Sequence, residues 1–422
     1  MSFYGSLILV DSIKDRMRFG FDYLCTMKQN EQFRQFIREH ASDDPMRLLL
    51  SASNYPDVDV PFAVEQLLAR RQIKEKLPTW YQNDALLFPA KITAEQCSSE
   101  QTALYKQRLV KEDEALCDLT GGLGIDSYYF SRKVRSVTYI ERFPAYCEAA
   151  KANFEVLGAG NIKVLQGDAA EWIGQMEGID LFYIDPARRG EGNRRLFALH
   201  DCEPDLTKLL PLLLQRAPKV IAKLSPMADI QMTLEQLPGT REIHVLSVRN
   251  ECKELLFVVE GGETSASIPI HCIHFDVQGG EQSFTFTLTE EQQAQVSLAS
   301  AIGSYLYEPN ASLLKAGAFK SIAARLHLQK LHISSHLYTS DQPVMDFPGR
   351  IFQIEEVIPF HNKVCKQLPQ SLPQANITVR NFPLSVDALR KKTRIREGGS
   401  VYLFATTLAS GEKVLVKGSK CR

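Results

Sequence analysis

The chain has 422 residues, 44% of them hydrophobic. A chain of this length is too long to fold around a single hydrophobic core and is typical of two to four domains. Its net charge of −1 provides no overall field toward nucleic acid or membranes, so any electrostatic role has to come from local clustering of charge. The nine cysteines are scattered without a CxxC pair, so neither a zinc ribbon nor a disulfide framework is indicated. With an early apolar run of only residues 7–10, we expect a cytoplasmic protein without membrane contact.

The N-terminal part, residues 1–92, is expected to form a helical domain. Apolar residues recur at helical spacing, as in Phe33, Phe36 and Ile37, and the same period returns at residues 62–71, after a turn at 54–57. The first 26 residues lack this period, and Met27 is an alternative start. The sequence therefore leaves open whether residues 1–26 belong to the native chain.

Between residues 93 and 262, short β-type runs alternate with helical stretches. The expected strands are 115–119, 137–140, 162–165, 179–184 and 220–224. This alternation predicts a parallel sheet with right-handed crossovers. Two further runs, 243–248 and 255–260, are separated by about five residues, too few for a helical crossover, so we expect them to pair antiparallel.

Acidic or glycine-rich signals follow the first four expected strands in order. Residues 118–124 read DLTGGLG, Glu141 ends the second strand, Asp168 follows the third, and residues 185–189 read DPARR. Because an open parallel sheet binds ligands at the carboxyl ends of its strands, the ordered series locates a nucleotide-like ligand site. Glu141 lies where a carboxylate can accept hydrogen bonds from both ribose hydroxyls, but NAD-binding folds use that position too.

These signals resemble those of the class I S-adenosylmethionine-dependent methyltransferases, which implies a Rossmann-like seven-stranded sheet. In this resemblance Thr120 replaces the first glycine of motif I, while Gly122 and Gly124 let the backbone approach the methionine part of the cofactor. The loop lacks the third glycine of a dinucleotide fingerprint, which favours S-adenosylmethionine over NAD. The residues that the resemblance assigns to cofactor binding are Asp118, Thr120, Gly121, Gly122, Gly124, Glu141, Asp168 and Asp185.

Asp185 and Pro186 occupy the position that faces the reactive methyl group in this family, and we assign catalysis to them. In relatives that methylate amines, the motif continues with a second proline and an aromatic residue, and its acceptors orient the amine for in-line attack. This chain has Ala187 and Arg188 instead, which disfavours a flipped nucleobase amine. We expect direct transfer with no metal and no covalent intermediate. Covalent uridine methylation needs a cysteine after the fifth strand, where residues 223–226 read KLSP.

Positive charge gathers in two places that are expected to bind substrate. The first follows the Asp185 motif and comprises Arg188, Arg189, Arg194 and Arg195. The second is the C-terminal stretch 360–422, whose twelve Lys or Arg and three acids leave +9, so the rest of the chain carries about −10. Its densest run is Arg390, Lys391 and Lys392. Guanidinium and ammonium groups in such clusters suit a phosphate backbone, with a solvated basic face as the alternative.

The whole arrangement resembles bacterial methyltransferases with a C-terminal THUMP-like domain, in residues 306–311 (LYEPNA), 381–384 (NFPL) and 389–392 (LRKK). The expected domains are a helical domain 1–92, a methyltransferase domain 93–262, a small α+β, ferredoxin-like segment 263–306 and a basic THUMP-like α+β domain 307–422. THUMP modules are associated with RNA, so the resemblance implies an RNA substrate, tRNA or rRNA. Methylation of a protein or small molecule, and a non-catalytic RNA-binding protein with a vestigial fold, stay open, and the oligomeric state is not readable.

Three other local patterns give expectations about structure. His271 and His274 lie on an expected strand, where alternation sends them to opposite faces, so we expect no structural metal there. Asp201 and Glu203 precede Pro204, which predicts a helix start at this proline, with the acids as caps. Helices are expected at 290–302 and 311–326.

Overall fold

The computed structural model describes residues 31–188, 199–262, 265 and 267–421. The chain forms two compact units. The first contains Met1–Leu224, Glu235–Pro238 and Val258–Gly262, and the second contains Ser225–Leu234, Gly239–Phe257 and Glu263–Arg422. The four-part division expected from the sequence stays a prediction.

The N-terminal part of the first unit is helical, as expected. Its helices are α2 (Glu31–Glu39), α3 (Pro45–Leu50), α4 (Val60–Ile73), α5 (Pro78–Tyr81), α6 (Lys91–Gln96) and α7 (Glu100–Lys106), with the short 3-10 turns η1 (Ala52–Asn54) and η2 (Gln107–Leu109). Phe33, Phe36 and Ile37 are buried in one apolar cluster with α4. The helical spacing of these residues therefore predicted the buried face of α2 correctly.

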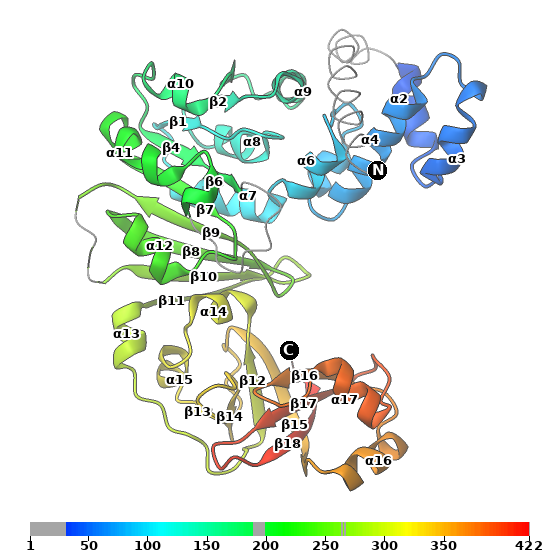
Figure 1. Cartoon of the computed structure of the whole chain (residues 1–422), viewed down its shortest axis with the longest axis vertical. Helices are drawn as coiled ribbons and strands as arrows, with labels where there is room; N and C mark the ends of the chain where they lie inside the picture. The colour runs from blue at the N-terminus through cyan, green and yellow to red at the C-terminus, as the bar shows by residue number, and fades with distance from the viewer. Residues whose placement is uncertain (1–30, 189–198, 263–264, 266, 422) are drawn as a thin grey trace, which may run out of the picture. The chain divides into compact units, whose positions relative to one another are not determined.

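A parallel five-stranded arrangement follows in the first unit (Figure 1). Its strands are β1 (Ala115–Asp118), β2 (Ser136–Glu141), β3 (Ile162–Gln166), β4 (Leu181–Ile184) and β7 (Lys219–Leu224), in the order β7-β4-β1-β2-β3. All four neighbouring pairs are parallel. The connecting helices are α8 (Ile125–Ser131), α9 (Pro144–Val156), α10 (Ala169–Ile173) and α11 (Leu206–Arg216). The carboxyl ends of these strands therefore share one edge, as the alternation predicted.

Short elements lie between β4 and α11. They are β5 (Ala187–Arg188), η3 (Leu199–Asp201) and β6 (Cys202–Glu203), and β5 pairs antiparallel with β6. The expected helix start at Pro204 is wrong, because α11 begins at Leu206 and its cap is Asp205, whose carboxylate accepts a hydrogen bond from Thr207 N. A side chain one residue before the helix reaches the exposed amides, whereas Asp201 and Glu203 lie too far upstream.

The sheet continues beyond these five strands. The added strands are β8 (Thr240–Val248), β9 (Glu251–Val259), β10 (Pro269–Phe275) and β11 (Glu281–Thr287), and the full order is β11-β10-β8-β9-β7-β4-β1-β2-β3. Arg249 and Asn250, both at positive φ, form the two-residue link between β8 and β9, which confirms the expected antiparallel pair. The nine strands exceed the expected seven because β10 and β11, assigned to a separate segment, pair onto β8. Helix α12 (Ile230–Gln236) precedes β8.

The rest of the second unit contains a separate seven-stranded sheet, drawn in yellow to red in Figure 1. Its strands are β12 (Tyr305–Pro309), β13 (Gln329–Lys330), β14 (Tyr338–Ser340), β15 (Gly349–Pro359), β16 (Asn376–Arg380), β17 (Val401–Thr407) and β18 (Lys413–Lys420). Helices are α13 (Leu288–Gln293), α14 (Ala311–Ala316), α15 (Ser321–Arg325), α16 (Asn362–Ser371) and α17 (Val386–Thr393).

Two expected helices of this unit are shorter than the sequence predicted. The helix expected at 290–302 ends at Gln293, and the one expected at 311–326 is divided into α14 and α15. Gly317, at φ 80°, ends α14 in the left-handed conformation that glycine adopts most easily. Over the described residues, no helix has the length and apolarity needed to cross a membrane.

Candidate active site

A cavity of about 310 Å³ in the first unit opens at the carboxyl ends of the parallel strands. Its lining includes the glycine loop after β1, Glu141 at the end of β2, Asp168 after β3 and Asp185 after β4. Lys223, near the end of β7, lines the same cavity. The structure therefore brings together the four signals that the sequence placed at the ends of separate strands.

The glycine loop packs directly against the ring of Tyr139. A Cβ on Gly121 would lie 2.2 Å from Tyr139 Cε2, and a Cβ on Gly124, at φ 81°, would lie 2.6 Å from Phe154 Cζ. The Tyr139 hydroxyl donates a 2.6 Å hydrogen bond to Gly122 O. These contacts need glycine at residues 121 and 124, and they hold the loop backbone at the cavity.

Asp118 stabilises the loop from inside the protein. Its carboxylate accepts hydrogen bonds from Thr120 N at 3.0 Å and from Ser127 Oγ at 2.6 Å. Complete burial raises the pKa of Asp118 to about 7, because desolvation disfavours the charged form more than these two donors favour it. Thr120, which replaces the first glycine of the motif, accepts a 2.7 Å hydrogen bond from Asp185 N. Thr120 thus connects the loop to the end of β4.

Glu141 and Asp168 present carboxylates on two adjacent strand ends. Glu141 accepts hydrogen bonds from Gly122 N and Phe143 N, each at 2.9 Å and each on a different oxygen. Asp168 caps α10 by accepting from Ala170 N at 2.9 Å and is exposed. A carboxylate oxygen has two lone pairs, so these carboxylates can accept further bonds from a ligand.

A charged network that sequence reasoning missed surrounds Asp185. Lys223 Nζ lies 2.5 Å from Asp185 Oδ2, 3.1 Å from Ser98 Oγ and 3.9 Å from Asp126 Oδ2. Fully buried Lys106 forms a 2.9 Å ion pair with Asp126. Burial alone would raise the pKa of Asp126, but the ammonium groups of Lys106 and Lys223 outweigh burial and lower it. The sequence did contain a signal for Lys223, because this residue lies at the end of the fifth expected strand. The same rule, that ligands bind at the carboxyl ends of parallel strands, identified Asp185.

Glu203 also lines the cavity, although the sequence predicted a helix cap. It forms a 2.6 Å ion pair with Arg142, and β5–β6 pairing places it opposite Ala187. Pro186 is buried beside this ladder. Of the expected arginine cluster, the structure gives only the backbone of Arg188, in β5, and Arg189, Arg194 and Arg195 lie outside the described residues.

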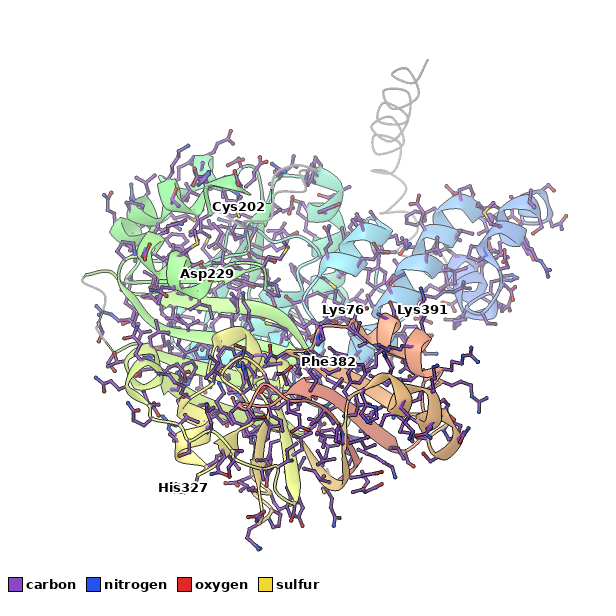
Figure 2. The ribbon with its side chains drawn as sticks, turned by 60° about the horizontal axis from the view of Figure 1, so that its bottom comes forward. Lys76, Cys202, Asp229, His327, Phe382 and Lys391 are labelled. Carbon is purple, nitrogen blue, oxygen red and sulfur yellow. The ribbon has the colours of Figure 1, made fainter. Side chains whose placement is uncertain are left out.

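The basic run of the second unit lies on α17, where Figure 2 labels Lys391. Its members differ in their surroundings. The Arg390 guanidinium donates to Ile395 O and Ala375 O, each at 3.3 Å. Lys391 is exposed, and Lys392 Nζ lies 5.3 Å from the centre of the Phe360 ring. The charges of the two lysines are therefore exposed at the surface. Arg390 instead stabilises its own domain through bonds to backbone carbonyl groups.

A crystal structure of a candidate methyltransferase from Porphyromonas gingivalis W83 matches nearly the whole chain. It is 38% identical, with a TM-score of 0.84, and the match covers 93% of this chain and 98% of that one. An uncharacterized S-adenosylmethionine-dependent methyltransferase of Mycobacterium tuberculosis is 27% identical over 241 residues, 57% of this chain. This chain belongs to the S-adenosylmethionine-dependent methyltransferases. The mycobacterial match spans 63% of that relative, less than two thirds of its length.

Family models describe the C-terminal part of this methyltransferase. Residues 305–348 match a ferredoxin-like domain, and residues 349–419 match a THUMP-like domain. The resemblance to class I methyltransferases with a C-terminal THUMP-like domain is thereby confirmed. The cavity also fits the family's cofactor, because a Cβ on Gly122 would meet only Thr120 O, at 3.8 Å, and two carboxylates stand at neighbouring strand ends.

Proposed function

We propose that this methyltransferase transfers a methyl group to RNA, directly and at the Asp185 end of the cavity. The observation that carries the proposal is the convergence of Gly122, Glu141, Asp168 and Asp185 on one cavity. S-adenosylmethionine, when bound, supplies an electrophilic sulfonium methyl group. Glu141 would hold the ribose hydroxyls and Asp168 the adenine amine, and the glycine loop would leave space for the methionine part.

Asp185 orients the acceptor and Lys223 orients Asp185. The 2.5 Å contact of Lys223 Nζ with Asp185 Oδ2 restricts rotation of the carboxylate, so Oδ1 is the oxygen that accepts a hydrogen bond from the substrate. Thr120 Oγ1 fixes the backbone of the same residue. Both contacts fix Asp185, which in turn positions the methyl acceptor before transfer begins. Such positioning accounts for much of the rate acceleration in reactions between two bound groups.

RNA is supported by charge and by the C-terminal domain. Residues 349–419 match the THUMP-like model, and the +9 stretch of residues 360–422 includes Lys391 and Lys392 on α17. Phosphates are neutralised by such cations, independently of base sequence. We assign Arg188, Arg189, Arg194 and Arg195 to the substrate as well, because they follow Asp185 directly in the chain.

The proposal is tested by mass spectrometry of nucleosides from cells with and without the gene. We expect one methylated nucleoside to disappear on deletion and to return with the parent gene, but not with Asp185→Ala. In vitro, Asp185→Ala should lose at least about 100-fold in turnover, the lower end for a positioned acid or base, with S-adenosylhomocysteine affinity within a few fold. Asp113→Ala, an exposed carboxylate ahead of β1, is the matched control and should keep full turnover. Unchanged nucleosides, with methyl transfer to protein instead, would contradict RNA as the substrate.

A further inference from the structure

Three potential metal ligands gather on β8 and β10 in the second unit, and none of them is used above for methyl transfer. Glu242 and His244 are two residues apart on β8 and so share one face, and strand register pairs His244 with His271 on β10. The two imidazole rings are stacked, with centroids 4.6 Å apart and an interplanar angle of 18°. One ligand atom from each of the three residues falls within 4.8 Å of the others.

The spacing of these atoms matches a shared ion better than direct hydrogen bonds. Glu242 Oε1 lies 3.5 Å from His244 Nε2, and Glu242 Oε2 lies 3.4 Å from His271 Nε2. Hydrogen bonds between imidazolium and carboxylate are shorter, about 2.7–2.9 Å. Metal–ligand bonds of about 2.0–2.2 Å in a tetrahedron separate the ligand atoms by roughly 3.3–3.6 Å. The two separations between Glu242 and the histidines fall in this range, and one ligand atom of each of the three residues lies within 4.8 Å of the others.

Neighbouring groups prepare both imidazoles for a metal. His271 Nδ1 lies 2.9 Å from Thr285 Oγ1 on β11, which fixes the ring with Nε2 toward Glu242. Such a second partner orients the ring of most metal-binding histidines. The imidazole of His244 is buried, and its ring stacks on that of His271. His274, three residues along β10, faces away and contacts Ser247 Oγ at 2.9 Å.

We propose that Glu242, His244 and His271 bind one divalent transition-metal ion, with zinc as the metal that suits them. Two imidazoles and a carboxylate form the donor set of open zinc sites, in which water takes the fourth position. Calcium and magnesium prefer oxygen ligands alone, and copper(I) prefers thiolates, so the donor set disfavours these ions. The ion would cross-link β8 and β10 of the sheet, and the site is independent of the proposed methyl transfer.

Zinc binding to the full-length protein, stripped of metal by a chelator, provides the test. Calorimetry should show one equivalent bound to the parent, with a rise in melting temperature. Cobalt(II) should give the visible absorption of a four- or five-coordinate ion without a thiolate charge-transfer band. This second readout separates the site from the nine cysteines of the chain, which could also bind zinc.

Variants on the same strands identify the ligands. Glu242→Gln and His271→Ala should each weaken zinc affinity more than 100-fold, and Thr285→Val, which removes only the orienting hydroxyl of an exposed residue, should weaken it about 10–100-fold. His274→Gln is the matched control and should bind zinc like the parent. Absence of zinc binding to the parent would overturn the proposal, as would affinity that is unchanged in His271→Ala or Thr285→Val.

Discussion

Gly121 occupies the most constrained glycine position in the lining of the first-unit cavity. A methyl group there would lie 2.2 Å from a carbon of the buried Tyr139 ring, whereas a methyl group on Gly174 would meet no described atom within 4 Å. Gly121→Ala should therefore displace the loop, destabilise the protein by about 1–3 kcal/mol and weaken S-adenosylhomocysteine binding. Gly174→Ala keeps its helical φ of −63° and should be neutral or stabilising by about 0.4–1 kcal/mol.

Urea unfolding and ligand calorimetry on these two glycine variants measure the two effects separately. Equal stability and equal ligand affinity in the two variants would mean that the Tyr139 ring does not restrict the loop.

Asp118 makes stability depend on pH in a direction that is unusual for an aspartate. Its pKa is about 3.9 in an unfolded chain and is raised to about 7 by burial in the folded protein. Between these values the folded protein keeps a proton that the unfolded chain has released. The contribution of Asp118 is therefore full below about pH 4 and is lost as pH rises through 7, by roughly 1.4 kcal/mol per pH unit.

Asp118→Asn removes this titration and isolates it from other groups. The unfolding free energy of the parent relative to the variant should fall steadily between about pH 4 and pH 7, and then level off. Urea midpoints across that range provide the measurement. A relative stability that rises with pH would show that Asp118 is ionised in the folded protein.

At the level of whole elements, the periodic parts of the fold were predictable and the long-range pairings were not. β1 and β4 are buried on both faces, so their sequences are largely apolar and easy to recognise as strands. The acidic residues that follow them were recognisable because ligands bind at the carboxyl ends of parallel strands. We expected a domain boundary between residues 262 and 263, yet β10 pairs with β8 across it. A local sequence pattern contains no information on that pairing.

The candidate site divides in the same way. Gly121, Glu141, Asp168 and Asp185 each follow a strand and could be found one at a time. Lys106 and Asp126 could not be found in this way, because their ion pair joins two helices, α7 and α8, that come together only in the folded protein. The proximity of Glu242 and His271 depends likewise on the register of β8 with β10, so the alternation of His271 and His274 along one strand does not reveal it.

Helix α17 is the element on which the RNA proposal can be tested most selectively. Lys391→Ala with Lys392→Ala removes two exposed charges and should weaken RNA binding while reducing the salt slope by roughly one for each phosphate that is no longer neutralised. Lys111→Ala with Lys163→Ala, exposed lysines of the first unit, should leave both quantities unchanged. Gel-shift titrations at several salt concentrations give the slopes, and equal slopes for the two double variants would contradict an RNA-binding role for α17.

For the whole molecule, the charge is polarised although its sum is nearly zero. Residues 360–422 carry a net charge of +9 and the rest of the chain about −10. We therefore expect salt to affect the binding of RNA and of S-adenosylhomocysteine differently. Raising salt from 50 to 200 mM should weaken RNA binding at least about 10-fold, because phosphate binding releases counterions. S-adenosylhomocysteine binding should change little, since that ligand brings no phosphate to the pocket.

Calorimetry with S-adenosylhomocysteine, on the parent protein and on Glu141→Ala, tests most directly whether the cavity holds the methyl donor. Glu141 has no assigned part in RNA binding, and its carboxylate borders the cavity beside the glycine loop. We predict one site on the parent and at least about 10-fold weaker binding in the variant, the cost of a hydrogen bond to a charged group. No binding to the parent at millimolar ligand, or equal affinity in both proteins, would contradict the assignment of this cavity.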